Sequence, residues 1–322
     1  MVKNFPCHPN TTQIEYKKIR NECAIITCCS SKYAPYLANA IASLKCNFAD
    51  HPVIIIYDIG LSWFEVKEFS SIKDVELRKV PNFVSHWRLN WSWKLYALIN
   101  SLNRYNLYLD LPNFVVNRSL ATLFCIISKH GYLLVENKQK LNEITPSEYW
   151  KFYNIGNITV KNQPTFGAGI IGFDRRHDSF FAIEKSMNDI VLGLNLGRSV
   201  TEKNKNYKPN IIRDCVCFRA DQTILNLSFR QLYGIHLKIR KSARICGFGQ
   251  RSNHPYQFLW YSRRSNDSLS YFYVKTGRSM ISFIVNRVKW LLKIKSKKVA
   301  KLIVVKLTSL FHSHLDIFKS IS

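Results

Sequence analysis

The sequence predicts an α/β domain built around a mostly parallel central sheet. Short apolar runs alternate with segments in which apolar residues recur every three to four positions, the pattern of buried strands alternating with amphipathic helices. The clearest strands are expected at 23–28, 53–57 and 106–109, and the last two lead directly to Asp58 and Asp110. Since such alternation forms βαβ units, we expect a Rossmann-like sheet with both aspartates at the carboxyl ends of strands.

Each expected element between residues 20 and 140 has a local reason. The strands are short runs rich in β-branched and aromatic residues, and the helices carry one apolar face. Ser119 is a good N-cap for one helix, and Gly131 stands where that helix is expected to end. In chain order we expect a strand at 23–28, a helix at 36–44, strands at 53–57 and 75–80, a helix at 93–102, a strand at 106–109, a helix at 120–130 and a strand at 132–135.

Beyond residue 140 the alternation is looser. A glycine-punctuated apolar run at 166–173 precedes helices expected at 180–191 and 220–232. The basic segment 195–210 is interpreted as a solvated loop, with a mobile lid as the alternative. Near the end of the chain, lysines and arginines are interleaved with apolar residues. The sequence therefore divides into an N-terminal extension (1–20), the α/β domain (21–275) and a basic amphipathic helical tail (276–322).

Composition and charge narrow the class of protein. The chain has 322 residues, 47% hydrophobic and 13% aromatic, which excludes a disordered or collagen-like chain. Lys and Arg number 47 against 21 Asp and Glu, a net charge of +26, and residues 251–322 hold 14 of the basic residues against two acidic ones. The charge predicts an anionic partner, namely a nucleotide phosphate, a nucleic acid or an acidic lipid. A compositional bias of the source is the alternative explanation.

Cysteine usage and hydropathy favour a location inside the cell. The nine cysteines include no CxxC pair, so the sequence predicts neither a disulfide framework nor a zinc ribbon. No apolar run approaches the ~20 residues of a membrane-spanning helix. We expect a cytoplasmic protein whose tail either lies on an anionic membrane at its inner face or packs on the domain with its lysines outward.

Five short motifs occur in order along the chain. They are VIIIYDIGLS at 53–62, WSWK at 91–94, LYLDLPNFVV at 107–116, FGAGII at 166–171 and DQTILN at 221–226. Through them the chain resembles GT-A fold nucleotide-diphospho-sugar transferases, in particular relatives of glycosyltransferase family eight. The resemblance implies a GT-A type domain that moves a sugar from a nucleotide-sugar donor to a hydroxyl of a glycan or lipid-linked glycan acceptor, such as a growing surface polysaccharide.

The resemblance also implies roles for particular residues. Asp221 and Gln222 are expected to act in catalysis or to orient the acceptor, although Asp221 is equally well interpreted as a helix N-cap. Lys94 is expected to offset the negative charge of the departing nucleoside diphosphate. Independently of the resemblance, the position of residues 30–32 just after the first expected strand makes their backbone N–H groups a further expected phosphate contact. The expected donor-binding residues are Thr27, Tyr33, Asp58, Lys94, Asp110, Ala168 and Gly169.

The acidic motif departs from the family pattern at one position. The pattern places two carboxylates at i and i+2, so that both reach one Mn²⁺ or Mg²⁺ bound to the donor diphosphate. Here Pro112 stands at the second position, which leaves Asp110 with Asn113 as a weak substitute. Three alternatives remain open: a divalent cation held by Asp110 and His254, a metal-independent enzyme that uses cationic side chains, and an inactive relative.

A basic interaction protein on a catalytically degenerate transferase fold is the alternative function. Such a protein would bind nucleic acid or a membrane, and the segment 260–264 (WYSRR) interleaves aromatic and basic residues as nucleic-acid-binding surfaces do. However, the sequence carries no RRM, KH, zinc-finger or helix-turn-helix signature. The expected partners are therefore a nucleotide-sugar donor, a glycan acceptor and, through the tail, an anionic membrane surface, and nucleic acid is not expected.

Overall fold

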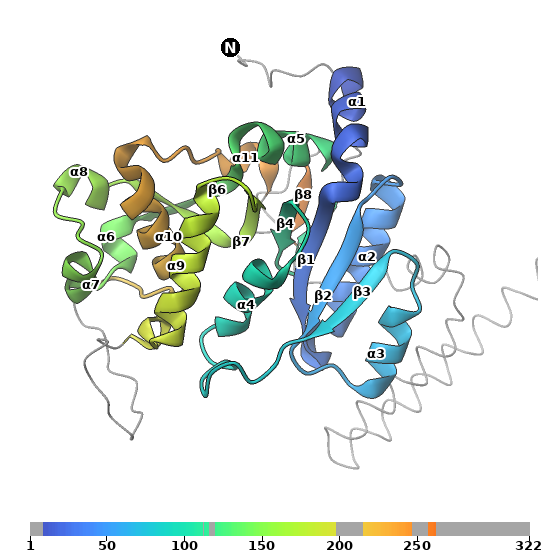
Figure 1. The fold of residues 1–322 in the computed structure, drawn as a ribbon, viewed down its shortest axis with the longest axis horizontal. Helices are drawn as coiled ribbons and strands as arrows, with labels where there is room; N and C mark the ends of the chain where they lie inside the picture. The colour runs from blue at the N-terminus through green and yellow to red at the C-terminus, as the bar shows by residue number, and fades with distance from the viewer. Residues whose placement is uncertain (1–8, 112, 116–119, 198–214, 247–256, 262–322) are drawn as a thin grey trace, which may run out of the picture. The chain divides into compact units, whose positions relative to one another are not determined.

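The computed structural model describes the chain in five stretches (Figure 1), which are residues 9–111, 113–115, 120–197, 215–246 and 257–261. The chain divides into two compact units, Met1–Ser268 and Leu269–Ser322. Everything described below belongs to the first unit. The expected tail at 276–322 and most of the expected loop at 195–210 lie outside the described residues.

Six strands form one twisted sheet in the order β3-β2-β1-β4-β7-β6. β1 pairs in parallel with β2 and β4, and β2 pairs in parallel with β3, whereas β7 runs antiparallel to both β4 and β6. A separate antiparallel pair joins β5 to β8. The strands are β1 (Cys23–Cys29), β2 (Val53–Asp58), β3 (Val75–Lys79), β4 (Tyr105–Leu109), β5 (Asn113–Val115), β6 (Tyr132–Lys140), β7 (Pro164–Asp174) and β8 (Leu259–Tyr261). The predicted α/β class with a mostly parallel sheet is confirmed.

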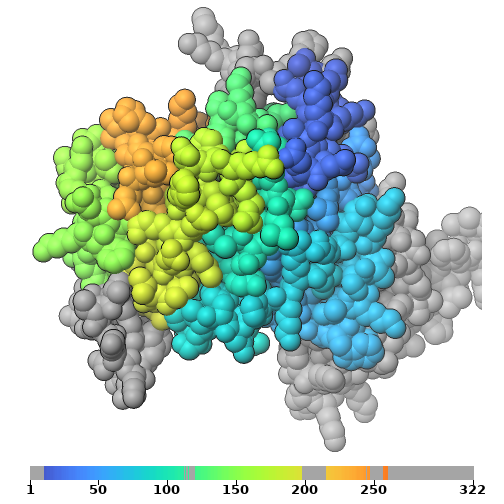
Figure 2. Space-filling view, viewed as in Figure 1, coloured from blue at the N-terminus to red at the C-terminus, as the bar shows by residue number. Residues whose placement is uncertain are grey.

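The helices cover the sheet and form the walls around its carboxyl ends. α10 packs beside α9, and α9 packs on α4, so that these three helices follow one another across one side of the molecule (Figure 1). Figure 2 shows the segments of α4 and α9 in contact on the face in view. The helices are α1 (Pro9–Ile19), α2 (Ala34–Asn47), α3 (Trp63–Ser70), α4 (Ser92–Asn100), α5 (Ala121–His130), α6 (Leu141–Ile144), α7 (Ser147–Phe152), α8 (Ile158–Lys161), α9 (Ser179–Val191), α10 (Ala220–Tyr233) and α11 (Ser242–Ile245).

The burial of the central strands explains why their sequences are continuous apolar runs. Every residue of β1 and β4 is buried, because helices cover both faces of the sheet there and leave no solvent side for polar residues. The edge strand β3 (VELRK) is only partly buried and carries charged residues. Gly131 ends α5 in the left-handed conformation, as its position in the sequence predicts. In the stretches described, no helix combines the length and the apolar character needed to cross a membrane.

The N-terminal extension contains a helix that the sequence did not predict. α1 (PNTTQIEYKKI) has few apolar residues, so its helical period is hard to detect. It packs against α5 through Tyr16, which is fully buried between Phe48 and Phe124. The Tyr16 hydroxyl donates to the Asp50 carbonyl at 2.8 Å. α3 also went undetected, although Ser62 and Glu65 form a capping box at its start.

The core leaves no room for a side chain at Gly172 in β7. A Cβ there would lie 2.5 Å from Ile127 Cδ1 and 2.8 Å from Leu133 Cβ. We therefore expect Gly172→Ala to lower the free energy of unfolding by about 1–3 kcal/mol, the usual cost of overpacking a core. Gly156→Ala is the matched control, because a Cβ at Gly156 meets nothing within 4 Å. Denaturant unfolding of both variants checks this, and equal stability of the two would contradict it.

Candidate active site

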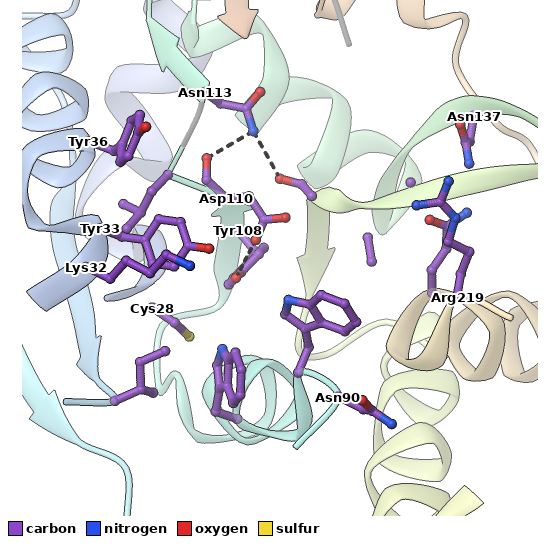
Figure 3. A pocket seen from close by; sticks show the side chains of 18 residues that line it. Cys28, Lys32, Tyr33, Tyr36, Asn90, Tyr108, Asp110, Asn113, Asn137 and Arg219 are labelled. Atoms are coloured by element: carbon purple, nitrogen blue, oxygen red, sulfur yellow. Dashed lines mark hydrogen bonds between the residues drawn. The ribbon is translucent and has the colours of Figure 1, made fainter. Parts of the chain in front are cut away.

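A pocket of about 920 Å³ opens at the carboxyl ends of β1 and β4. Its volume is typical of small-molecule sites, and its place is the one where α/β sheets bind ligands. Side chains reach it from the end of β1 and the turn that follows, the start of α4, the end of β4, the middle of β7 and the start of α10 (Figure 3). Segments far apart in the sequence therefore meet in one cavity.

Asp110 lies between the two sides of this pocket, directly after β4 (Figure 3). Its N–H donates to the Gly169 carbonyl at 2.8 Å, and its own carbonyl accepts from the backbone N–H of Asn113 at 3.0 Å. The side chain is 40% exposed, so its carboxylate is available to a ligand. A Cβ on residue 169 would lie 3.0 Å from Asp110 Oδ2, so glycine there leaves room for the carboxylate.

Tyr108 fixes the orientation of this carboxylate from below. Its hydroxyl donates to Asp110 Oδ1 at 2.8 Å. Burial, and then the negative charge of Asp110, raise the pKa of Tyr108 well above its ordinary value. The hydroxyl therefore stays protonated and remains a donor throughout the neutral range.

A buried ion-pair cluster lies behind Asp110. Lys94 Nζ is 2.8 Å from Asp221 Oδ2 and 3.5 Å from the Asp110 carboxylate, and it donates to the Ala168 carbonyl at 3.2 Å. The Lys94 and Asp221 side chains are only 4% and 7% exposed. Because one ammonium stands between two carboxylates from different elements, the cluster joins α4, β4 and α10 behind the pocket.

Burial and charge act in opposite directions on this cluster. Burial alone lowers the pKa of Lys94, but Asp110 and Asp221 outweigh it, and the pKa of Lys94 is raised above its ordinary value. Burial raises the pKa of Asp221, although Lys94 opposes this shift. The lysine thus stays charged and holds both carboxylates in place.

Two cationic side chains line the pocket from opposite sides. Lys32 and Arg219 are both exposed, and Asp110 lies between them in Figure 3. Within the described stretches, neither side chain forms an ion pair. The Lys32 ammonium lies 5.5 Å from the ring centroid of Tyr33, on the same side as Tyr36. Their charge is therefore free to act on an anionic ligand.

Gln222 contributes a hydrogen-bond donor that lacks a partner. It lines the pocket from the first turn of α10, and its Nε2 is buried without any hydrogen bond to the described residues. Buried polar atoms are nearly always paired, so an unpaired one at the edge of a pocket indicates a place for a ligand atom.

The structure brings most of the predicted site residues together. Five of them line the pocket, namely Tyr33, Asp110, Ala168, Gly169 and Gln222. Lys94 and Asp221 lie directly behind it in the ion-pair cluster, so Lys94 acts on Asp110 and Asp221 instead of facing the cavity. His254 lies outside the described residues.

Besides Lys94, two further predicted donor-binding residues do not line the pocket. Thr27 is buried, and its hydroxyl has no hydrogen-bond partner among the described residues. Asp58 closes the turn after β2, where its Oδ1 accepts the N–H groups of Gly60 at 2.8 Å and Leu61 at 2.7 Å. A carboxylate at a strand end commonly closes a turn in this way. The Ser31 N–H expected to face phosphate likewise donates to the Gly60 carbonyl, at 3.0 Å.

Several lining residues were missed from the sequence. Arg219, Asn90 and Asn137 line the pocket but belong to no recognised motif. Arg219 stands two positions before the DQTILN segment, so its nearness to that motif in the sequence was the one available signal. Asn90 and Asn137 reach the site only through the tertiary fold.

The described residues do not form a site for a divalent cation. No cluster of three or more His, Cys, Asp or Glu side chains suited to a metal occurs in the described stretches. Among the described residues, Asp110 is the one carboxylate that lines the pocket, and the Lys94 ammonium lies 3.5 Å from it. The Asn113 Oδ1 accepts from Cys246 Sγ at 3.2 Å, so its Nδ2 faces the Asp110 carbonyl. Mg²⁺ and Mn²⁺ prefer several oxygen ligands, and this donor set does not supply them.

Glycosyltransferases are among the solved structures that resemble this fold. One is the galactosyltransferase LgtC in complex with donor and acceptor sugar analogues, 14% identical over 79% of this chain and 95% of that chain, with a TM-score of 0.47. Another is the bifunctional glycosyltransferase WbbM in its apo form, 11% identical over 80% of this chain and 50% of that one, with a TM-score of 0.49. A scan against protein-family models finds no match, and neither does a search of the curated proteins. At these scores the likeness assigns no activity by itself.

Proposed function

We propose that this protein is a glycosyltransferase that moves a sugar from a nucleoside-diphosphate sugar to a hydroxyl of a glycan acceptor. One observation carries the proposal: the Asp110 carboxylate and Gln222, whose Nε2 has no hydrogen-bond partner among the described residues, line the same pocket at the carboxyl ends of the sheet. A carboxylate accepts hydrogen bonds from sugar hydroxyls and an amide donates to them. This pairing suits a hydroxyl-rich ligand better than an apolar one.

The nucleotide fits the side of the pocket built by Lys32, Tyr33 and Tyr36. Tyr33 is 41% exposed, and its ring lies 6.0 Å from that of Tyr36, so an aromatic surface is open to a base. Lys32 adds a positive charge beside it for the diphosphate. The free cation and the aromatic surface together support a nucleoside diphosphate as the leaving group.

In the proposed reaction an acceptor hydroxyl attacks the anomeric carbon, the bond from that carbon to the diphosphate oxygen breaks, and the hydroxyl proton passes to the departing diphosphate. Negative charge then grows on the departing diphosphate, where Lys32 supplies compensating charge. Asp110 holds a hydroxyl of the transferred sugar, and Lys94 and Tyr108 hold Asp110. Of the three alternatives we propose the metal-independent reaction, in which cationic side chains act on the diphosphate; of the expected Asp110 and His254 ligands, only Asp110 belongs to the described residues.

The sequence supports a finer view of the acceptor. The basic residues of 276–322 favour a glycan presented at an anionic membrane surface, such as a lipid-linked glycan met at the inner face of a membrane. Nucleic-acid binding is not favoured, because a small-molecule pocket with a central carboxylate is poorly suited to a phosphate backbone.

A thermal-shift screen against UDP-, GDP-, CMP- and dTDP-linked sugars, each with and without Mn²⁺, tests the proposal. A ligand that binds only the folded state adds about 2.7 kcal/mol of stability at 100 times its Kd. We expect one nucleotide series to raise the Tm without Mn²⁺ and to release its nucleoside diphosphate slowly. A shift that requires Mn²⁺ would overturn the metal-free reaction, and no shift with any donor would overturn the glycosyltransferase.

The proposed phosphate contact predicts a loss of donor affinity in Lys32→Ala. Hydrogen bonds to charged groups contribute about 1.5–3 kcal/mol, so the donor Kd should rise roughly 10- to 100-fold. Lys18→Ala is the control, because Lys18 is an exposed lysine on α1 that does not line the pocket. Titration calorimetry with the donor found in the screen measures both. Equal affinities in the two variants would remove Lys32 from the donor site.

A further inference from the structure

Backbone strain gathers at this pocket. Five described residues other than glycine have positive φ, and three of them adjoin the pocket: Asn90 (46°), Trp91 (61°) and Ala220 (38°). Trp91 has ψ of 25°, which places a bulky residue in the left-handed helical region at a cost that only glycine avoids. Strain of this kind persists where the surrounding structure enforces it, and it is commonest at functional sites.

Asn195, which is distant in the sequence, holds the backbone around Trp91 in this conformation. It is fully buried in the short 3₁₀ helix Leu194–Leu196, which follows α9. Its carbonyl accepts from Asn90 Nδ2 at 3.0 Å, and its own Nδ2 donates to Ser92 Oγ at 2.7 Å. Asn195 therefore binds the residues on both sides of Trp91 and fixes the turn that begins α4.

Burial of the Trp91 side chain does not offset the cost of its strained backbone conformation. The residue is 51% exposed while lining the pocket. By contrast, Trp87, four residues earlier, is only 7% exposed in the core. A strained turn that keeps a large aromatic side chain half in solvent has no reason in stability alone. An exposed indole offers a flat apolar surface of the kind that stacks on the C–H face of a sugar ring.

The turn that contains Asn90 lies on the opposite side of the pocket from the proposed nucleotide site. Asn90 lies on the Arg219 side of Asp110, whereas Lys32, Tyr33 and Tyr36 lie on the other (Figure 3). We propose that Trp91 is the stacking platform for a sugar ring of the acceptor and that Asn195 is the positioning residue that presents it. The inference rests on the proposed glycosyltransferase function and adds the acceptor subsite to it.

Two reactions of the same enzyme separate this role from a donor role. The donor identified by the thermal-shift screen is incubated with water alone, and then with methyl glycosides of galactose, glucose, mannose and N-acetylglucosamine. In Trp91→Ala we expect the acceptor KM to rise roughly tenfold, the scale of one aromatic stacking contact, while donor hydrolysis by water is unchanged. Trp91→Phe should recover part of the affinity. Trp63→Ala is the control, since Trp63 is 65% exposed on α3 and does not line the pocket.

Asn195→Ala should raise the acceptor KM in the same way with little change in kcat, because the indole loses its fixed position. A residue with a structural role alone would lower the Tm and leave KM unchanged. The proposal is overturned if donor hydrolysis falls with transfer in Trp91→Ala, or if no methyl glycoside binds in a Trp91-dependent way, which saturation-transfer NMR detects without turnover. A wild-type protein that binds no donor overturns the proposed function instead.

Discussion

Asp110→Asn is expected to reduce sugar transfer by about 10²–10³-fold, the usual cost of removing one preorganised charged contact from a transition state. The substitution keeps the shape of the side chain and an oxygen that accepts from Tyr108. It removes the one carboxylate that faces the pocket in the described stretches. The measurement is release of the nucleoside diphosphate by the donor that the thermal-shift screen selects.

The folded state should tolerate this change. Lys94 keeps its closer partner Asp221 at 2.8 Å, and Asp110 is 40% exposed, so the loss of the longer contact should cost no more than about 1 kcal/mol. Asp50→Asn is the matched control, because Asp50 is an exposed aspartate away from the pocket. If Asp110→Asn retained full turnover, or if the two variants lost it equally, the site would be wrongly placed.

The sheet was predictable from the sequence because its signals are local. β1, β2 and β4 are apolar runs enclosed on both faces, and their burial appears directly in the sequence as continuous apolar residues. α1 could not be found in this way, since its attachment depends on one tyrosine packed between two distant rings. The antiparallel direction of β7 is a tertiary property that its run of residues does not encode.

Site residues could be predicted where a sequence motif coincides with the carboxyl end of a predicted strand. Asp110 follows a buried strand, and the parallel sheet brings that end to the pocket. Asp58 satisfies the same criterion, yet its carboxylate closes its own turn, because two backbone N–H groups lie within reach. The burial of Lys94 was also beyond prediction, since it depends on Asp221, which is 127 positions away in the sequence. Strand-end chemistry can therefore be read from the sequence, whereas the choice among candidate residues depends on what surrounds each of them.

The second large effect is expected at Lys94. Lys94→Met replaces the buried ammonium with an uncharged chain of similar length and leaves Asp221 buried without its partner. Breaking a buried pair from one side costs about 3–5 kcal/mol, which lowers the Tm of a protein of this size by roughly 10 °C. Lys241→Met is the control, because Lys241 is 78% exposed and its pair with Glu136 lies at the surface. Turnover should also fall, since Asp110 loses the ammonium that holds it.

The same variant should show a distinctive dependence of stability on pH. Burial already raises the pKa of Asp221, and removal of Lys94 raises it further. A carboxyl whose pKa is higher in the folded state binds its proton more tightly there, so the folded state loses stability as the pH rises through that raised pKa. In the wild-type protein, Lys94 does not make stability depend on pH in the neutral range, because its pKa is raised and it stays charged there. The Tm deficit of Lys94→Met should therefore grow from pH 5 to pH 8.

Lys94→Met with Asp221→Asn removes both charges and should recover most of the Tm but not the turnover. A deficit independent of pH, or a double variant less stable than Lys94→Met alone, would show that the buried charge of Asp221 is not the cause.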